Sequence, residues 1–350
     1  MVKRFAFAVP GDLATPTGGY AYDRRMIVEL GDLGWQVDLL DLGEGFPWPS
    51  EATRTAALTQ LLSMPAGRAI VVDGLALGAL PDAASQLRGR NPLLALVHHP
   101  LALEAGLSDK QADALRGSER TALSSVQGVV VTSAATARLV AADYGVPAER
   151  IAVARPGSDP APLAQGSRDG VVRLLSVGAV VPRKGFDVLI AALATLTDLP
   201  WLLSIAGDRT RDRDAAARLD ADIAGHALEK RVAVLGAVSP QHLAKLYAQA
   251  DAFVLASHFE GYGMAYAEAL AHGLPVIGTH GSAIPDTVPP EAGVLVPPGD
   301  IASLSAALRR LIGDKELRRR LSSGARAAAL QLPTWRQSAE IFARALERLA

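Results

Sequence analysis

The chain has 350 residues, of which 49% are hydrophobic, with a formal net charge of -1 and no cysteine. This length favours two domains, and the near-neutral charge gives no electrostatic case for nucleic acid as a partner. The absence of cysteine excludes disulfides, thiolate metal sites and cysteine nucleophiles, and it fits a reducing compartment.

The N-terminal segment MVKRFAFAVPGD contains an apolar run that is too short for a secretory signal and is broken by Pro10 and Gly11. No apolar stretch of the sequence is long enough to span a bilayer. We therefore expect a soluble cytoplasmic protein, with peripheral contact at the inner membrane face as an open alternative.

The N-terminal half alternates short apolar runs with amphipathic runs. Strands are predicted at 4–9, 36–42, 69–73, 93–98, 128–132 and 151–154. Helices are predicted at 21–33, 51–63, 75–88, 109–126 and 134–144. This alternation indicates βαβ units and a parallel sheet covered on both faces, in which ligands bind beyond the carboxyl ends of the strands.

Two features of this half are candidate ligand contacts. Gly18 and Gly19 precede the first predicted helix, where they form either a plain turn or a flexible loop facing a ligand; the GxGxxG dinucleotide fingerprint is absent. His98 and His99 follow a predicted strand, and Asp73 ends another. Neighbouring residues of an extended chain point to opposite sides, so the two rings would not easily hold one metal ion.

A stretch rich in Pro, Gly, Ser and Asp separates the two halves. It runs from 156 to 170 and has the composition of a linker. We therefore expect an N-terminal domain over 1–160 and a C-terminal domain over 170–333. Strands of the second half are predicted at 171–177, 201–206, 232–235, 252–255, 275–277 and 293–296.

Cations follow the first strand of the second half. Arg183 and Lys184 lie just before a helix expected to begin at Phe186 or Asp187. A cation pair at a helix N-terminus can neutralise a diphosphate, although a solvated basic loop is the simpler alternative. Gly207-Asp208 ends the next predicted strand.

Two carboxylates frame a glycine loop further along. Glu260 precedes and Glu268 follows the segment GYGMAYA, whose glycines let backbone amides approach a ligand. Helix 264–272 follows the loop. Because the carboxyl ends of parallel strands meet at one edge, we expect this loop, the Arg183 loop and the Asp208 loop to converge.

These residues carry a family resemblance. The chain resembles the retaining glycosyltransferases of the GT-B fold, family 4 type, often called glycosyl transferases group 1. The most specific element is FEGYGMAYAE followed by ALAHGLPVIGT, and the RKG loop and TGGYAYDRRM support it. The ordered set, which includes VVTSAATARLVAADYGVPAERIAVARPGSD, covers nearly the whole chain.

The resemblance implies an α/β protein with two Rossmann-like domains facing across a cleft, and a final helix, 334–350, that packs back on the N-terminal domain. It implies no cofactor and no metal. The C-terminal domain would hold a nucleotide-sugar donor. The acceptor, a saccharide, a lipid-linked or a small molecule, would be bound by the N-terminal domain through residues 10–22 and 98–107.

The resemblance also assigns roles to single residues. Glu268 would bind the ribose and Glu260 would lie near the sugar. The implied catalytic residues are His98, Arg183, Lys184 and Glu260. The implied donor-binding residues are Gly18, Gly19, Gly178, Gly207, Asp208, Gly261, Tyr262, Gly263, Met264, Ala265 and Glu268. Many members have an arginine where this chain has Ala179, and Arg183 would supply that charge.

The reaction implied is transfer of the sugar to an acceptor hydroxyl with retention. No buried nucleophile is evident on the expected face, which favours front-face attack over double displacement. A nucleotide-sugar epimerase and a non-catalytic sugar-nucleotide binding protein on the same scaffold are the alternatives. An epimerase would form product from the donor alone, without an acceptor.

Overall fold

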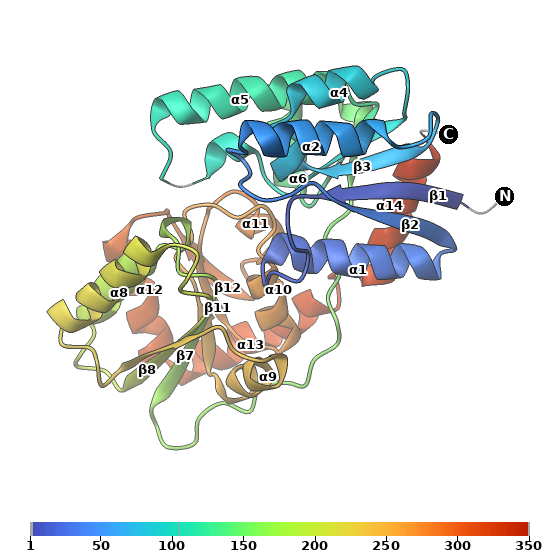
Figure 1. The fold of residues 1–350 in the computed structure, drawn as a ribbon. Coiled ribbons are helices and arrows are strands. Elements are labelled where there is room, and N and C mark those ends of the chain that lie inside the picture. The colour runs from blue at the N-terminus through green and yellow to red at the C-terminus, as the bar shows by residue number, and fades with distance from the viewer. Residues whose placement is uncertain (1–2, 105, 349–350) are drawn as a thin grey trace. The chain divides into compact units, whose positions relative to one another are not determined.

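The chain divides into two compact units in the computed structural model, which describes residues 3–104 and 106–348. Unit 1 comprises Met1–Gly157 and Pro333–Ala350, and unit 2 comprises Ser158–Leu332. Figure 1 shows the ribbon with its element labels. Two expectations fall partly outside the described residues: the loop 98–107 contains residue 105, and the predicted last helix extends to residue 350.

Unit 1 is built on a six-stranded parallel sheet with the strand order β2-β1-β3-β4-β5-β6. Its strands are β1 (Lys3–Val9), β2 (Trp35–Asp41), β3 (Ala69–Asp73), β4 (Leu93–Val97), β5 (Gly128–Val131) and β6 (Ile151–Val153). Its helices are α1 (Gly18–Asp32), α2 (Glu51–Leu62), α3 (Gly74–Leu77), α4 (Pro81–Leu87), α5 (Asp109–Ser124), α6 (Ala134–Tyr144) and α14 (Trp335–Glu347), with 3₁₀ turns η1 (Leu101–Leu103) and η2 (Ala148–Arg150).

Helices cover both faces of this sheet, which explains why its central strands are apolar on both sides. All five residues of β4 are buried. Helices α1 and α14 lie together on one face (Figure 1), where the rings of Phe7 and Phe342 stack with centroids 6.5 Å apart. Helix α14 begins with a capping box at Thr334 and Gln337, although it follows unit 2 in the sequence.

Unit 2 repeats this architecture around a second six-stranded parallel sheet, with the order β12-β11-β10-β7-β8-β9. Its strands are β7 (Val172–Val177), β8 (Trp201–Ala206), β9 (Val232–Gly236), β10 (Ala252–Val254), β11 (Val276–Thr279) and β12 (Gly293–Val296). Its helices are α7 (Phe186–Ala194), α8 (Arg213–Gly225), α9 (Pro240–Gln249), α10 (Met264–Ala271), α11 (Ile284–Thr287), α12 (Ile301–Gly313) and α13 (Lys315–Ala329), with the 3₁₀ turn η3 (Pro182–Lys184).

Two sequence predictions are wrong in detail. Helix α1 begins at Gly18, three residues early, because the Thr17 side chain accepts a hydrogen bond from the amide of Tyr20 and caps the first turn. Gly18 and Gly19 are therefore helical and do not form a flexible loop. The helix predicted at 75–88 is two helices, since Pro81 has no amide hydrogen to continue the first one.

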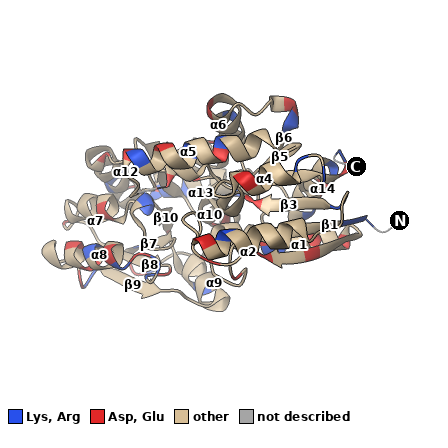
Figure 2. Ribbon diagram, turned by 45° about the horizontal axis from the view of Figure 1, so that its top comes forward, with Lys and Arg blue, Asp and Glu red and all other residues tan. Residues whose placement is uncertain are grey.

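Acidic and basic residues are mixed along the outer helices, as α5 and α8 show in Figure 2. The expected linker is irregular but anchored to unit 2, where the amides of Ala164 and Gln165 donate to the carbonyls of His272 and Ala248. Among the described residues, no helix is both long and apolar enough to cross a membrane.

Candidate functional site

The strand order of unit 2 brings three loops to one edge of the sheet. Strand β7 lies between β10 and β8, and all three run parallel. The segments that follow their carboxyl ends carry Lys184, Glu260 and Asp208 respectively, as the sequence predicts for neighbouring parallel strands.

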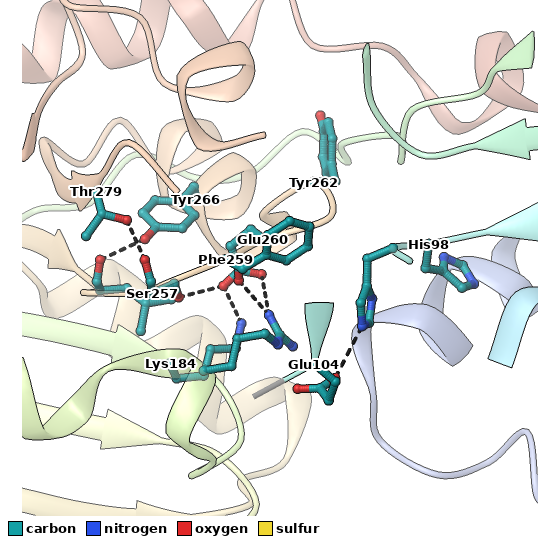
Figure 3. A network of polar contacts seen from close by, with 12 residues as sticks. His98, Glu104, Lys184, Ser257, Phe259, Glu260, Tyr262, Tyr266 and Thr279 are labelled. Atoms are coloured by element: carbon teal, nitrogen blue, oxygen red, sulfur yellow. Dashed lines mark hydrogen bonds and ion pairs between the residues drawn. The ribbon is translucent and has the colours of Figure 1, made fainter. Parts of the chain in front are cut away.

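The centre of this edge is an ion cluster around the Glu260 carboxylate (Figure 3). Lys184 Nζ lies 2.6 Å from Oε1, and Arg183 Nη1 lies 3.3 Å from Oε2. The Ser257 hydroxyl also donates to Oε1, at 2.6 Å. Arg183 Nη1 donates in addition to the Phe259 carbonyl, at 2.8 Å, so its guanidinium ties the η3 turn to the loop after β10.

The Glu260 carboxylate is buried, and it stays ionised because Lys184 and Arg183 lie beside it. Burial alone would raise the pKa of Glu260, but Lys184 and Arg183 more than offset this effect and the pKa is lowered. Two cations and one carboxylate leave a net charge of +1. The side chains of Lys184 and Arg183 keep 14% and 17% of their surface exposed, so an anion can reach them.

Close packing beneath the cluster requires glycine at two positions. The buried Tyr266 donates to the carbonyl of Leu255 at 2.7 Å. A Cβ at Gly263, whose φ is +90°, would lie 2.9 Å from the Tyr266 ring. At Gly185, with φ +62°, a Cβ would lie 2.2 Å from the carbonyl oxygen of Ala256. These two glycines hold the loop after β10 against the Lys184 turn.

Helix α10 begins next to this cluster without a side-chain cap. Its N-cap is Gly263, and the amides of Met264 and Ala265 have no acceptor within the described parts of the chain. Such first-turn amides carry partial positive charge and bind anions. The carbonyl of Tyr262 is held by Thr287, while its side chain points away from the Glu260 carboxylate in Figure 3.

Glu268 belongs to a different set of contacts, further along α10. The hydroxyl of the buried Tyr247 donates to its Oε2 at 3.0 Å. Burial raises the pKa of Glu268, and the Tyr247 hydrogen bond opposes that rise. The Tyr247 ring stacks on His272 at 4.7 Å, and His272 Nδ1 lies 2.8 Å from the carbonyl oxygen of Pro162. Tyr247 thus fixes the orientation of Glu268.

Replacing Tyr247 by Phe removes this hydrogen bond and keeps the ring. We expect the donor KM to rise roughly tenfold with little change in kcat, since a hydrogen bond to a charged group contributes about 1.5–3 kcal/mol. Steady-state kinetics would measure it. In a Glu268→Ala background, Tyr247→Phe should not raise the donor KM further. If the effects of the two substitutions on KM were fully additive, Tyr247 would not act through Glu268.

The other residues of unit 2 that are expected to contact a donor, Gly178, Gly207 and Asp208, also shape the loops locally. A Cβ at Gly207 would lie 1.8 Å from the carbonyl oxygen of Gly178, so the turns after β8 and β7 can approach only through glycine. The Asp208 carboxylate accepts from the amide and hydroxyl of Thr210, at 2.7 and 2.8 Å. A Cβ at Gly178 would lie 3.1 Å from Lys184 Cε, which places the lysine stem directly over this turn.

Unit 1 has its own cluster, at the carboxyl ends of β3 and β4. His98 Nε2 lies 3.1 Å from Asp23 Oδ1 and 3.4 Å from Asp73 Oδ2. Both carboxylates are buried, whereas the His98 side chain is 19% exposed. Gly19 allows this arrangement, since a Cβ there would lie 3.3 Å from the His98 ring. His99 instead pairs with Glu104, at 3.2 Å.

Three residues of these clusters were not predicted from the sequence: Asp23, Tyr247 and Ser257. Asp23 could have been found from its spacing, because it lies four residues after Gly19 and so on the same face of α1. Ser257 lies between the strand predicted at 252–255 and Glu260. Tyr247 carries no signal, since an aromatic residue in an amphipathic helix is normally a core residue.

The match to a known protein family lies in unit 2. Residues 163–328 match the family model of glycosyl transferases group 1. The MMP alpha-(1->4)-mannosyltransferase of Mycolicibacterium hassiacum is 27% identical over 289 residues, covering 74% of this chain and 67% of that protein. With several other curated relatives the chain spans about half of the relative's length.

Solved structures match across both units. A sucrose-phosphate synthase from Thermosynechococcus elongatus superposes with a TM-score of 0.82 at 21% identity, covering 99% of each chain. Anabaena HepE in complex with UDP and glucose superposes with a TM-score of 0.76 at 18% identity, covering 97% of this chain and 99% of HepE.

The chain therefore has the GT-B fold of glycosyltransferases. Its residues 163–328, nearly all of unit 2, match the glycosyl transferases group 1 model, and the curated relatives of the chain include named glycosyltransferases.

Proposed function

We propose that the chain transfers a sugar from a nucleoside-diphosphate sugar to an acceptor hydroxyl, with retention at the anomeric carbon and without a metal ion. The observation that carries the proposal is the net positive cluster of Lys184, Arg183 and Glu260 beside the first amides of α10, which have no acceptor among the described residues. It lies within the matched family domain, and HepE, a structural neighbour, was solved with UDP and glucose.

The donor is held through its charged and polar groups. The diphosphate contacts Lys184 and Arg183 and the amides at the start of α10, which are oriented before the ligand arrives. The ribose hydroxyls donate to Glu268, whose second oxygen is engaged by Tyr247. Glu260 keeps the two cations in place, and the diphosphate adds a second set of negative charges to them.

In the transfer step the bond from the anomeric carbon to the diphosphate oxygen breaks. The acceptor oxygen forms the new bond on the same face of the sugar, and its proton passes to the departing phosphate oxygen. Lys184, Arg183 and the α10 amides stabilise the charge that develops on the leaving group.

A thermal-shift screen of the full chain with UDP, GDP and ADP, in EDTA, tests donor binding. We expect one nucleotide to raise the Tm by several degrees, since a ligand at 100 Kd stabilises by about 2.7 kcal/mol. Stabilisation that requires Mg²⁺ or Mn²⁺ would contradict the metal-free site. With the matching nucleotide sugar, product formed without any acceptor would instead identify an epimerase.

A further inference from the structure

The ion cluster of unit 1 contains two buried carboxylates that have no role in the proposed transfer. Asp23, on α1, and Asp73, at the end of β3, are both buried, and their carboxylate oxygens and His98 Nε2 all lie within 4.8 Å of one another. Asp73 Oδ1 accepts from the Leu75 amide at 2.7 Å and caps α3, so this carboxylate is fixed by the backbone. Asp23 Oδ2 has no partner among the described residues.

The cluster holds the His98 ring by only one of its nitrogens. Nε2 faces the two carboxylates, and Tyr22 packs edge-on against the ring at 5.4 Å. The His98 carbonyl accepts from Thr132 on the neighbouring strand end, at 3.1 Å. Nδ1 has no partner within the part of the chain that is described, and the side chain is partly exposed.

We propose that Asp23 and Asp73 hold His98 as an imidazolium, with Nε2–H directed at the two carboxylates and Nδ1–H left as a hydrogen-bond donor. Two buried carboxylates without a cation are strongly unfavourable, and a neutral imidazole would supply none. Asp23 and Asp73 are positioning residues in this arrangement. The charge state is independent of catalysis and of the proposed function.

The charged groups around the His98 ring also favour the imidazolium. Burial alone would lower the pKa of His98, but Asp23 and then Asp73 raise it to about 10. Burial raises the pKa of Asp23 to about 6, although the neighbouring His98 opposes that rise. Tyr22 donates its hydroxyl to the Ala154 carbonyl and adds no charge.

NMR of the imidazole nitrogens in the full chain tests the charge state without any substrate. The protein has seven histidines, and a His98→Gln sample assigns the signal. We expect the His98 signal to show an imidazolium that keeps its proton between about pH 6.5 and 8.5. A wild-type His98 that loses its proton within this range would overturn the proposal.

Substitution of the two carboxylates provides a second test of the charge state. In the Asp23→Asn, Asp73→Asn double variant the His98 signal should titrate near its ordinary pKa of about 6.5. An unchanged wild-type pattern in the double variant would contradict the role of the carboxylates.

The same three residues could instead ligate a divalent cation, and one titration separates the two cases. Stoichiometric Mn²⁺ should leave the His98 signal sharp if Nε2 is protonated and paired with the carboxylates. Selective broadening of that signal at one Mn²⁺ per chain, absent in the double variant, would identify a metal site and overturn the proposal. The Asp113→Asn variant, in an exposed pair with Arg116, is the control for carboxylate removal.

Discussion

Replacing Lys184 by Ala should lower kcat by about 10²-fold or more at saturating donor, because it removes a preorganised charge from the leaving diphosphate. The ammonium lies 2.6 Å from Glu260 and its stem crosses the Gly178 turn, so its position does not depend on the ligand. The position after Gly178 is Ala179 in this chain, which leaves Arg183 as the second cation of the cluster. Steady-state kinetics with the identified donor measures the effect.

Lys245→Ala is the matched control, because Lys245 is exposed on α9 of the same unit and should leave kcat unchanged. Thermal unfolding of both variants shows whether the fold is intact. Near-normal kcat for Lys184→Ala at saturating donor would remove this lysine from the chemical step.

Replacing Glu260 by Gln should destabilise the protein by about 3 kcal/mol, because it removes the carboxylate that offsets two partly buried cations. For a domain of this size the loss corresponds to a decrease in Tm of roughly 10 °C. The pKa of Glu260 is lowered in the folded state, so its contribution is present above the ordinary pKa of glutamate and is lost on acidification. Differential scanning calorimetry at neutral and acidic pH measures both effects.

The control for Glu260→Gln is Glu316→Gln, which breaks an ion pair with Arg319 whose side chains are 76% and 67% exposed. An exposed pair of this kind contributes about 0–1 kcal/mol, so the control should barely change the Tm. If both substitutions have the same small effect, Glu260 is not the anchor of the two cations. The bound nucleotide should recover part of the stability that Glu260→Gln loses, since its phosphates supply negative charge.

The sequence predicted the architecture well because its signals are local. Strands such as β3 and β8 are continuous apolar runs bounded by turn residues, and their alternation with helices forces parallel sheets. The convergence of the Lys184 and Glu260 loops followed from that topology alone. The boundaries that were wrong depend on single contacts, such as the Thr17 cap that extends α1 to Gly18.

The polar partners could not be read from sequence to the same extent. Asp23 and His98 are 75 residues apart, and only the packing of α1 against the sheet makes one the counter-charge of the other. The contact of Tyr247 with Glu268 likewise joins two helices. A pattern predicts which residues lie at a sheet edge, whereas hydrogen-bond partners are decided by side-chain packing between elements.

We propose that Lys184, Arg183 and Glu268 of unit 2 bind the nucleoside diphosphate of the donor. Calorimetric titration of the full chain with the nucleotide selected by thermal shift, in EDTA, tests it most directly. We expect one nucleotide per chain, with affinity lowered about tenfold or more in both Lys184→Ala and Glu268→Ala, because each removes a charged hydrogen-bond partner. Unchanged affinity in both variants would contradict the claim.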